Sequence, residues 1–353
     1  MKKISIIGTC GIPARYGGFE TLAERLVQYL SDLYEISVYC STKSCSNKIA
    51  FYKGARLIYV NLKANGIQSV LYDNISILKA FLKTDSILLL GVSGAWIIPL
   101  MRILSKVKFI TNIDGIEWKR EKWGRFAKYF LKISEKIAVK YSHTVIVDNV
   151  GIKEYVEKFY QRIDIHVITY GGDSIYSNAM TIQCESKYYF TVCRIEPENN
   201  IHLLLEAFTY LKEKIIIVGN WENCRYSKSL YNVYHTHENI SLLSPIYDVD
   251  RLNQLRANAY CYLHGHSAGG TNPSLVEAMY LELPVICFDV NFNRYTTHNQ
   301  AIYFSTSDEL KKIIETITDK ELDVIKKRMS NIAKKYYSWN LICQEYDKIF
   351  DGT

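Results

Sequence analysis

The feature that most constrains the fold is an alternation of short apolar segments with helical segments along the whole chain. The first series predicts strands at residues 4–7, 36–40, 56–60, 86–90, 109–112 and 144–147, with helices at about 19–30 and 123–141. A second series predicts strands at residues 189–192, 214–218, 240–243, 259–263, 284–288 and 301–304, with a helix at about 201–211. Strands separated by helices indicate βαβ units with right-handed crossovers and parallel sheets.

The two series are separated by Tyr170-Gly171-Gly172-Asp173. We therefore predict an α/β protein of two Rossmann-like domains, residues 1–172 and 173–353, which face each other across a cleft. The last helix, at about residues 339–350, is expected to cross back to the first domain. A chain of 353 residues with 48% hydrophobic residues is long enough to bury two cores.

The charge distribution indicates what kind of partner the chain binds, and its cysteine content indicates the redox state of its compartment. Up to Gly172 the chain has 25 Lys and Arg against 14 Asp and Glu, and the remainder has 18 against 22. The first domain is therefore expected to meet something anionic, and a solvated basic face that binds nothing is the alternative. The nine cysteines have no zinc-like spacing and indicate reduced thiols. The N-terminal apolar run is too short for a secretory signal, and the uncharged residues 86–101 are too few for a membrane span.

A glycine-containing loop, residues 8–20, connects the first strand to the first helix. Ligands of open parallel sheets bind at this end of the strands, and the N–H groups of a helix start favour an anion. Gly17 and Gly18 are candidates for contact with a phosphate or sugar, and a loop that only turns the chain is the alternative. The segment lacks the G-x-G-x-x-G spacing of a dinucleotide site, and the second strand ends in Cys40-Ser41, where such a site needs an acidic residue.

Two segments of the second domain have the same placement after a strand. Arg194 opens the first of them and has the fork of donors that suits a phosphate, with a surface salt bridge as the alternative. In the second, Asn272-Pro273-Ser274 predicts a helix start, and Glu277 follows one turn later, either to bind a ribose or as a helix residue favoured by the dipole. The candidate phosphate-, sugar- and ribose-binding residues are Gly17, Gly18, Arg194, Asn200, His266, Gly270, Thr271, Asn272, Ser274 and Glu277.

Asp114 and Glu117 are the candidate catalytic residues. They follow a strand of the first domain, at the end where ligands of open sheets bind, and are placed to orient a reacting group of a substrate, while a turn at Asp114 is the alternative reading. Asp248-Val249-Asp250 resembles a D-x-D metal motif, but Asp250 precedes a helical run and is expected to be its N-cap. No metal site and no cofactor are therefore predicted.

Residues 118–130 mix basic and aromatic side chains. Segments that sit on anionic lipid use this combination, and a solvated helix surface is the alternative. No nucleic-acid motif accompanies the charges, so no nucleic-acid partner is expected. The candidates for facing a membrane are Trp118, Lys119, Arg120, Lys122, Trp123 and Arg125.

Over nearly its whole length the chain resembles GT-B glycosyltransferases of family 4. The segments at residues 7–20, 112–120, 194–200 and 269–279 are similar to the signature of the bacterial subgroup that includes β-1,4-rhamnosyltransferases of surface polysaccharide synthesis. The resemblance implies that Gly17 and Gly18 border the diphosphate and the reacting sugar. It also implies that Arg194 binds the diphosphate and Glu277 the nucleotide ribose.

Three positions depart from the pattern of these relatives. Asn199 stands where the wider family has a lysine, Gly269 where it has a glutamate that touches the donor sugar, and Cys10 where the subgroup usually has arginine. The resemblance as a whole implies a retaining transferase that uses a nucleotide-diphospho-sugar, expected to be dTDP-L-rhamnose. The expected acceptor is a lipid-linked saccharide of O-antigen or capsule synthesis.

This reading places the protein in the cytoplasm, peripheral on the inner face of the cytoplasmic membrane, with an anionic membrane surface as a partner. Two alternatives stay open. One is a nucleotide-sugar epimerase of the same GT-B architecture. The other is a non-catalytic nucleotide-sugar-binding partner, which the departures at Asn199 and Gly269 motivate.

Overall fold

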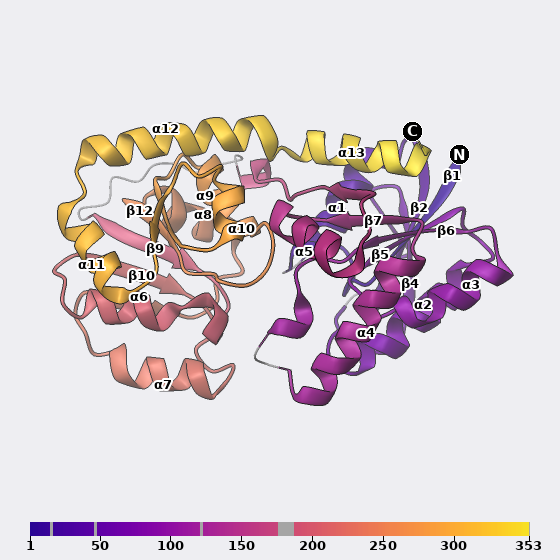
Figure 1. Ribbon diagram of the computed structural model, residues 1–353, viewed down its shortest axis with the longest axis horizontal. Coiled ribbons are helices and arrows are strands. Elements are labelled where there is room, and N and C mark those ends of the chain that lie inside the picture. The colour runs from indigo at the N-terminus through magenta and orange to yellow at the C-terminus, as the bar shows by residue number, and fades with distance from the viewer. Residues whose placement is uncertain (15–16, 46–47, 121–122, 176–186, 353) are drawn as a thin grey trace. The chain divides into compact units, whose positions relative to one another are not determined.

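The computed structural model describes residues 1–14, 17–45, 48–120, 123–175 and 187–352. It divides into two compact units, one formed by Met1–Thr169 with Asn340–Thr353 and the other by Tyr170–Trp339 (Figure 1). Each unit contains its own sheet with helices packed on it, so the predicted α/β class with two Rossmann-like parts is confirmed.

The sheet of the first unit has the order β3-β4-β2-β1-β5-β6-β7-β8. All neighbouring strands are parallel except β3 and β4, which are antiparallel. The strands are β1 (Lys2–Ile7), β2 (Tyr34–Ser41), β3 (Phe51–Tyr52), β4 (Ala55–Val60), β5 (Ser86–Leu90), β6 (Lys108–Asn112), β7 (Thr144–Val147) and β8 (Ile165–Val167).

The helices of the first unit are α1 (Gly18–Leu30), α2 (Gln68–Ala80), η1 (Ala95–Ile97), α3 (Ile98–Leu104), η2 (Glu117–Lys119), α4 (Arg125–Tyr141), α5 (Val150–Tyr160) and α13 (Trp339–Asp351). The connections β4 to β5, β5 to β6 and β6 to β7 step in one direction across the sheet. Because such crossovers are right-handed, α2, α3 and α4 cover the same face. The connection β1 to β2 steps the other way and places α1 on the opposite face.

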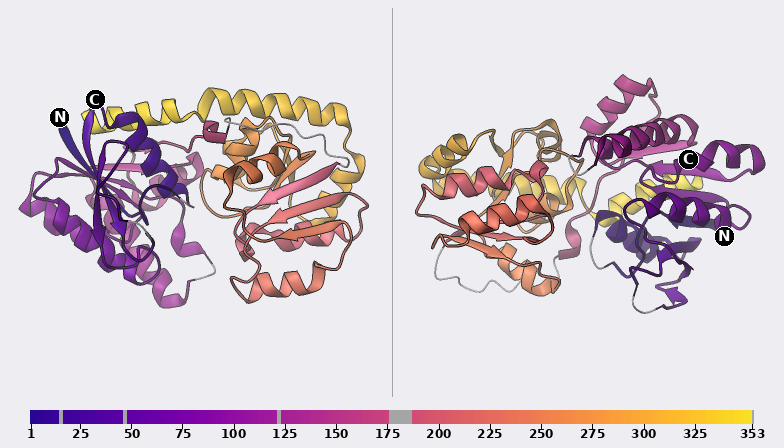
Figure 2. Two further views of the ribbon diagram at one scale, coloured as in Figure 1. Left: turned by 180° about the vertical axis from the view of Figure 1, so that it is seen from behind. Right: turned by 90° about the horizontal axis from the view of Figure 1, so that it is seen from below.

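The last helix packs on the first unit, as the sequence predicted. The Asn112 side chain donates to the Tyr346 hydroxyl at 2.9 Å, and Lys2 Nζ lies 2.7 Å from Asp351 Oδ1. Tyr346 and Phe350 of α13 are buried. The two ends of the chain therefore lie close together, as the views in Figure 2 show.

The second unit has a fully parallel sheet of order β11-β10-β9-β12-β13-β14. Its strands are β9 (Tyr188–Val192), β10 (Lys214–Val218), β11 (Ile240–Leu243), β12 (Cys261–His264), β13 (Val285–Phe288) and β14 (Ile302–Phe304). Its helices are η3 (Asp173–Ile175), η4 (Pro197–Asn199), α6 (Ile201–Phe208), α7 (Arg225–Tyr234), α8 (Val249–Ala257), α9 (Pro273–Tyr280), α10 (Asn291–Thr296), α11 (Ser307–Thr316) and α12 (Asp319–Tyr336).

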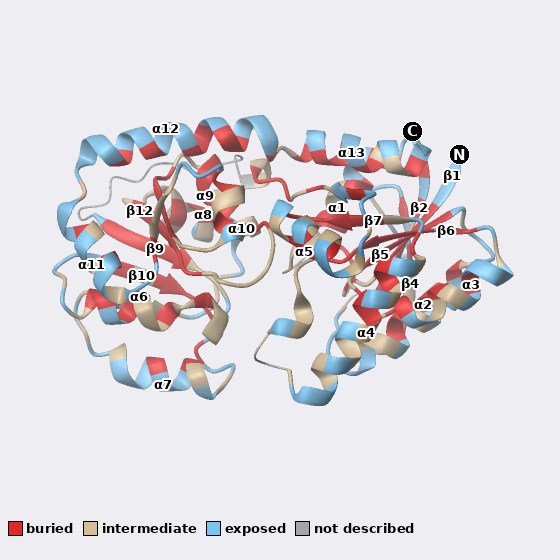
Figure 3. Cartoon of the chain, in the orientation of Figure 1, coloured by how far each residue is buried: buried red, intermediate tan, exposed pale blue. Residues whose placement is uncertain are grey.

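Burial follows the parallel arrangement of the strands. The strands of both sheets are mostly buried, and the helices bury the side that faces a sheet (Figure 3). Strands covered on both faces read as continuous apolar runs, as in the Ser86–Leu90 strand β5, whose five residues are all buried. Among the described residues, no helix has both the length and the apolar character needed to cross a membrane.

Candidate functional site

The loop that follows β1 is fastened to the start of α1 by a carboxyl group. Glu20 Oε1 accepts the backbone N–H of Cys10 at 2.7 Å, and burial raises the pKa of Glu20. Gly17 is the N-cap of α1 with φ 115°, and a Cβ there would lie 2.1 Å from Glu20 Oε2. The position therefore needs glycine for its backbone and for the approach of Glu20. Gly18 is the first residue of α1, so both candidate glycines lie at the helix start.

Asp114 lies in a tight turn directly after β6. Its backbone N–H donates to Asn112 Oδ1 at 3.0 Å, and its φ of 55° is in the left-handed region, which Asp tolerates better than most residues. Asn112 is itself buried and held by Tyr346 of α13. The turn reading therefore describes the backbone of Asp114, whose side chain is half-buried at the carboxyl end of the sheet.

Glu117 is bound to its own segment. Its carboxylate lies 3.1 Å from Arg120 Nε and accepts the Trp123 indole N–H at 3.0 Å. Both contacts are within six residues in the chain and tie Glu117 to Arg120 and to Trp123. The carboxylate of Glu117 thus has a structural task that sequence reasoning did not assign to it.

A buried carboxyl group that the sequence analysis missed, that of Glu135 on α4, binds Trp118 of η2. Glu135 Oε1 on α4 accepts the hydroxyls of Tyr155 at 2.7 Å and Tyr160 at 2.6 Å, and the indole N–H of Trp118 at 3.4 Å. Burial raises the pKa of Glu135. Its position beside Ser134 and Ala138 on the buried stripe of an amphipathic helix is the signal that could have identified it.

The candidate membrane-facing residues do not share one environment. Trp118 and Trp123 are half-buried, with their indole N–H groups turned to Glu135 and Glu117. Lys119 and Arg125 are exposed, whereas Arg120 is bound to Glu117, and Lys122 lies outside the described residues. The exposed aromatic residues nearby are Phe126 and Tyr129 of α4.

In the second unit, the loop after β9 joins the loop after β12. The Asn200 side chain donates to the Gly265 carbonyl at 2.9 Å, and the Ser267 N–H donates to the Glu198 carbonyl at 2.8 Å. Asn199 is buried and donates to the Arg194 carbonyl at 2.6 Å. Two predicted site segments, residues 194–200 and 264–274, are therefore brought together.

Arg194 itself lies at the surface of this loop pair. Its guanidinium is exposed, and its Nε is 3.9 Å from Glu196 Oε2, a long contact for an ion pair. A contact of this length at an exposed site contributes little to stability. The Asn199 side chain, which donates to the Arg194 carbonyl, holds this loop.

The predicted helix start at α9 is confirmed. Asn272 is the N-cap, and its Oδ1 accepts the Ser274 N–H at 3.0 Å and the Ser274 hydroxyl at 2.8 Å. Thr271 is buried, whereas a Cβ at Gly269, where φ is 116°, would meet no atom within 4 Å. The glycine loop before α9 is therefore open to a ligand at Gly269 and anchored beside it.

Glu277 is paired with a buried arginine. Glu277 Oε2 lies 2.9 Å from Arg256 Nη1, and the side chains are 25% and 3% exposed. Arg256 also donates to Asn253 Oδ1 at 3.3 Å. Arg256 comes from α8, and no pattern in the sequence indicates that it is buried, because its neighbour on the same helix face, Asn253, is polar as well.

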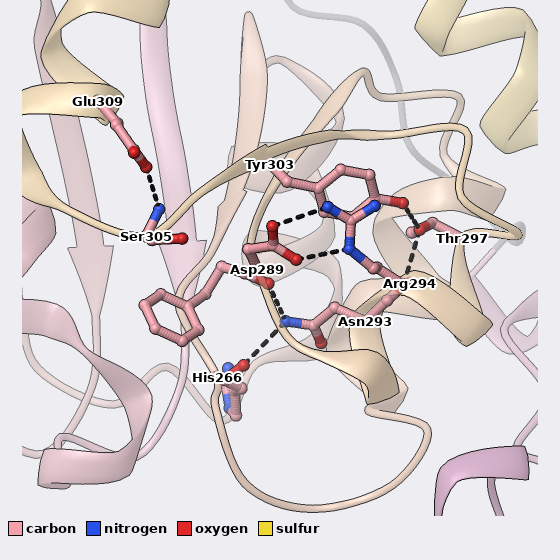
Figure 4. Close-up of polar contacts among 9 residues, drawn as sticks. His266, Asp289, Asn293, Arg294, Thr297, Tyr303, Ser305 and Glu309 are labelled. Carbon is pink, nitrogen blue, oxygen red and sulfur yellow. Dashed lines mark hydrogen bonds and ion pairs between the residues drawn. The ribbon is translucent and has the colours of Figure 1, made fainter.

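His266 lies on a loop that α10 supports. Its ring stacks on that of His264 with centroids 4.3 Å apart, and its carbonyl accepts the Asn293 side chain at 2.8 Å. Burial lowers the pKa of His264 to about 3, so that imidazole is neutral at ordinary pH. Asn293 also donates to the Phe288 carbonyl at 2.8 Å and so ties the His266 loop to the end of β13 (Figure 4).

The start of α10 is held by an ion pair and a stacked ring. Arg294 Nη2 lies 2.7 Å from Asp289 Oδ2, and the guanidinium lies over the Tyr303 ring, 4.2 Å from its centroid (Figure 4). The Arg294 partner lowers the pKa of Asp289. These contacts fix α10, and through Asn293 they fix the loop that carries His266.

The expected cap at Asp250 is wrong by two residues. Helix α8 begins at Val249, and Asp248 is its N-cap, with Oδ1 accepting the Arg251 N–H at 3.1 Å. The first carboxylate of the D-x-D motif is therefore the capping group, and Asp250 lies within the first turn. Within the described part of the chain, no three His, Cys, Asp or Glu side chains are grouped so that they could hold a metal ion.

Comparison with solved structures shows the fold of the chain. Solved structures of similar fold include sucrose-phosphate synthase from Thermosynechococcus elongatus, with a TM-score of 0.82 at 14% identity over 100% of both chains. HepE of Anabaena in complex with UDP-glucose has a TM-score of 0.75 at 13% identity, again over 100% of both chains. These matches confirm the GT-B fold that the sequence predicted.

Two family models each match a part of the sequence. Residues 175–336 match the model described as glycosyl transferases group 1, and residues 1–173 match a domain of unknown function, DUF1972. Residues 175–336 are therefore similar to glycosyl transferases group 1, and this match together with the GT-B fold supports a glycosyltransferase. No curated protein matches the sequence.

Proposed function

We propose that the protein is a retaining glycosyltransferase that takes a sugar from a nucleotide-diphospho-sugar, with dTDP-L-rhamnose as the proposed donor. The proposed acceptor is a lipid-linked saccharide in bacterial surface polysaccharide synthesis. One observation carries the proposal: in the group 1 domain, residues 194–200 and 264–274 join beside the start of α9, with the Glu277 carboxylate one turn further on. The complexes of HepE with UDP and with UDP-glucose support a nucleotide-sugar donor.

The donor contacts follow from the chemistry of these residues. A diphosphate needs cationic and N–H donors, and Arg194 and the open glycine loop at Gly269 and Gly270 are the groups that we propose to supply them. The Glu277 carboxylate, kept in one orientation by Arg256, is the proposed acceptor for two ribose hydroxyls. His266, Thr271, Asn272 and Ser274 complete the donor site in this proposal.

In the proposed reaction, the bond between sugar C1 and the diphosphate oxygen breaks, and the acceptor oxygen bonds to C1 on the same face. The acceptor proton passes to the leaving phosphate, so the protein positions groups and stabilises charge. We propose Asp114 as the residue that orients the acceptor hydroxyl. Glu117, whose carboxylate is bound to Arg120 and Trp123, would act by fixing the same segment.

We further propose that the enzyme works in the cytoplasm on the inner face of the membrane, where a lipid-linked acceptor presents its sugar. Among the described residues of the segment expected to face the surface, Lys119 and Arg125 are the exposed bases. Replacing both with Ser should weaken binding to anionic vesicles at low salt. Unchanged binding would show that this segment is a solvated surface only.

The central experiment incubates the purified protein with nucleotide sugars, with and without a lipid-linked acceptor. Release of nucleoside diphosphate together with a longer saccharide supports the proposal, and dTDP-L-rhamnose should be the preferred donor. An isomerised nucleotide sugar would identify an epimerase instead. Binding without turnover would identify a non-catalytic nucleotide-sugar-binding protein, for which the departures at Asn199 and Gly269 are the reason to test.

A further inference from the structure

One side of the first unit carries a row of exposed apolar residues along α2. They occur at intervals of three or four residues, which places them on one side of the helix and its flanking turns. Ile67 is 92% exposed and Leu82 is 79% exposed. The core-facing side of the same helix is separate and includes Tyr72 and Ile77. The row consists of Ile67, Leu71, Ile75, Leu78 and Leu82.

Helix α3 continues the apolar surface on the same face of the sheet. Leu100, Ile103 and Leu104 are exposed on it, Ile103 at 82%. The short helix η1 packs against both α2 and α4, and α3 packs against α4. Helices α2, α3 and α4 therefore form one layer (Figure 1). We call the five residues of the α2 row and these three the apolar ridge. Monomeric proteins rarely expose so many large apolar side chains in one place without a partner.

The exposed charges on helices α2, α3 and α4 have a single sign. Helices α2, α3 and α4, which the structure describes completely, contain seven Lys and Arg and two carboxylates. Both carboxylates, Asp73 and Glu135, are buried, so every exposed charge on the three helices is positive. The exposed bases are Lys79, Arg102, Arg125, Lys132, Lys136 and Lys140.

We infer that the apolar ridge and the bases beside it dock on the surface of an anionic lipid bilayer. Apolar side chains enter the boundary between head groups and acyl chains, while lysines bind anionic head groups, and stable attachment needs both contributions. A second copy of the chain is disfavoured as the partner, because a symmetric contact through this face would bring its positive charges together. The inference deepens the proposed function, since the lipid-linked acceptor is what gives the enzyme a reason to bind a membrane.

The experiment measures co-sedimentation with vesicles of phosphatidylcholine alone and of phosphatidylcholine with phosphatidylglycerol, at low and high salt. The test variant replaces the three most exposed ridge residues, Ile67→Ser, Leu82→Ser and Ile103→Ser. A matched control replaces three exposed apolar residues elsewhere, Leu33→Ser, Phe51→Ser and Val233→Ser. A charge variant replaces Lys79, Lys136 and Lys140 with Ser.

The wild type should bind anionic vesicles at least tenfold more tightly than neutral ones. The affinity of the ridge variant for anionic vesicles should fall at least tenfold at both salt concentrations. The affinity of the charge variant should fall at low salt only, and the control should bind like the wild type. Equal binding by the ridge variant and the wild type would overturn the inference, as would a wild type that ignores anionic vesicles at low salt. A dimer of the wild type that the ridge variant abolishes would identify a second copy as the partner. Vesicle binding needs no donor, so its failure is separable from failure of the transferase reaction, which is measured with a short soluble acceptor.

Discussion

Replacing Glu277 with Gln separates two tasks of its carboxylate, because Glu277 contacts Arg256 and is proposed to bind the donor ribose. Loss of one charged hydrogen-bond partner at a site that is largely buried weakens binding by about 1–3 kcal/mol, or about 5- to 150-fold in Kd. Removal of one partner of a fully buried ion pair costs about 3–5 kcal/mol in stability. The Glu277 side chain is 25% exposed, and Gln still offers an oxygen to Arg256. We therefore expect the free energy of unfolding to fall by about 2 kcal/mol.

The double variant Arg256→Met with Glu277→Gln distinguishes the two tasks. It removes the buried cation together with its anion, so the free energy of unfolding should recover relative to the single variant. The affinity for the nucleoside diphosphate should stay low, since the ribose contact is still missing. Urea denaturation measures the first quantity and isothermal titration calorimetry the second. Wild-type affinity in a folded Glu277→Gln protein would refute the ribose assignment, and affinity that recovers with stability would reduce Glu277 to a structural residue.

Three further predictions concern the metal dependence of transfer, the pH dependence of stability and the hydrogen bonds of Glu135. Transfer should persist in EDTA, because Arg194 and loop N–H groups are proposed to meet the phosphate charge; loss of activity that Mn²⁺ restores would contradict this and return Asp248 and Asp250 to consideration. The free energy of unfolding should fall as pH drops below about 6.5, since unfolded His264 gains a proton there while the buried imidazole, with a pKa of about 3, does not. His264→Phe should flatten this slope in urea titrations, and an unchanged slope would assign it to other groups. Glu135→Ala should cost at least about 2 kcal/mol in urea unfolding, because it leaves two hydroxyls and an indole N–H without their acceptor, and Glu135→Gln should cost less; equal losses would argue against the hydrogen bonds as the cause.

The fold was predictable because its signals are local. Each βαβ unit has an apolar run followed by an amphipathic helix, and these patterns depend on neighbouring residues only. The N-cap at Asn272 was predictable for the same reason. The cap of α8 was placed on Asp250 instead of Asp248 because either aspartate has the chemistry of a cap, and the choice depends on where the backbone turns.

The contacts that decide the candidate site are not local. Glu277 meets Arg256 from another helix, and Trp118 turns inward because Glu135 on α4 accepts its indole N–H. A sequence shows that a tryptophan and a lysine are adjacent, but not that a buried carboxyl group will orient one of them. The apolar ridge on α2 and α3 was missed because no helix was named at residues 68–80. Even with the helix known, exposed and core-facing rows have similar spacing, and only the packing shows which row faces the sheet.

The return of α13 to the first unit has a consequence for how the chain folds during synthesis. The first unit's sheet is complete when residue 169 has left the ribosome, yet the helix that supplies Tyr346 and Phe350 follows the 170 residues of the second unit, Tyr170–Trp339. At about 5–20 residues per second, this interval lasts roughly 10–35 s. During it, Tyr34 and Asn112 lack their partners Asp347 and Tyr346. The first unit to be translated is therefore the last to be completed, while the second can finish folding on its own.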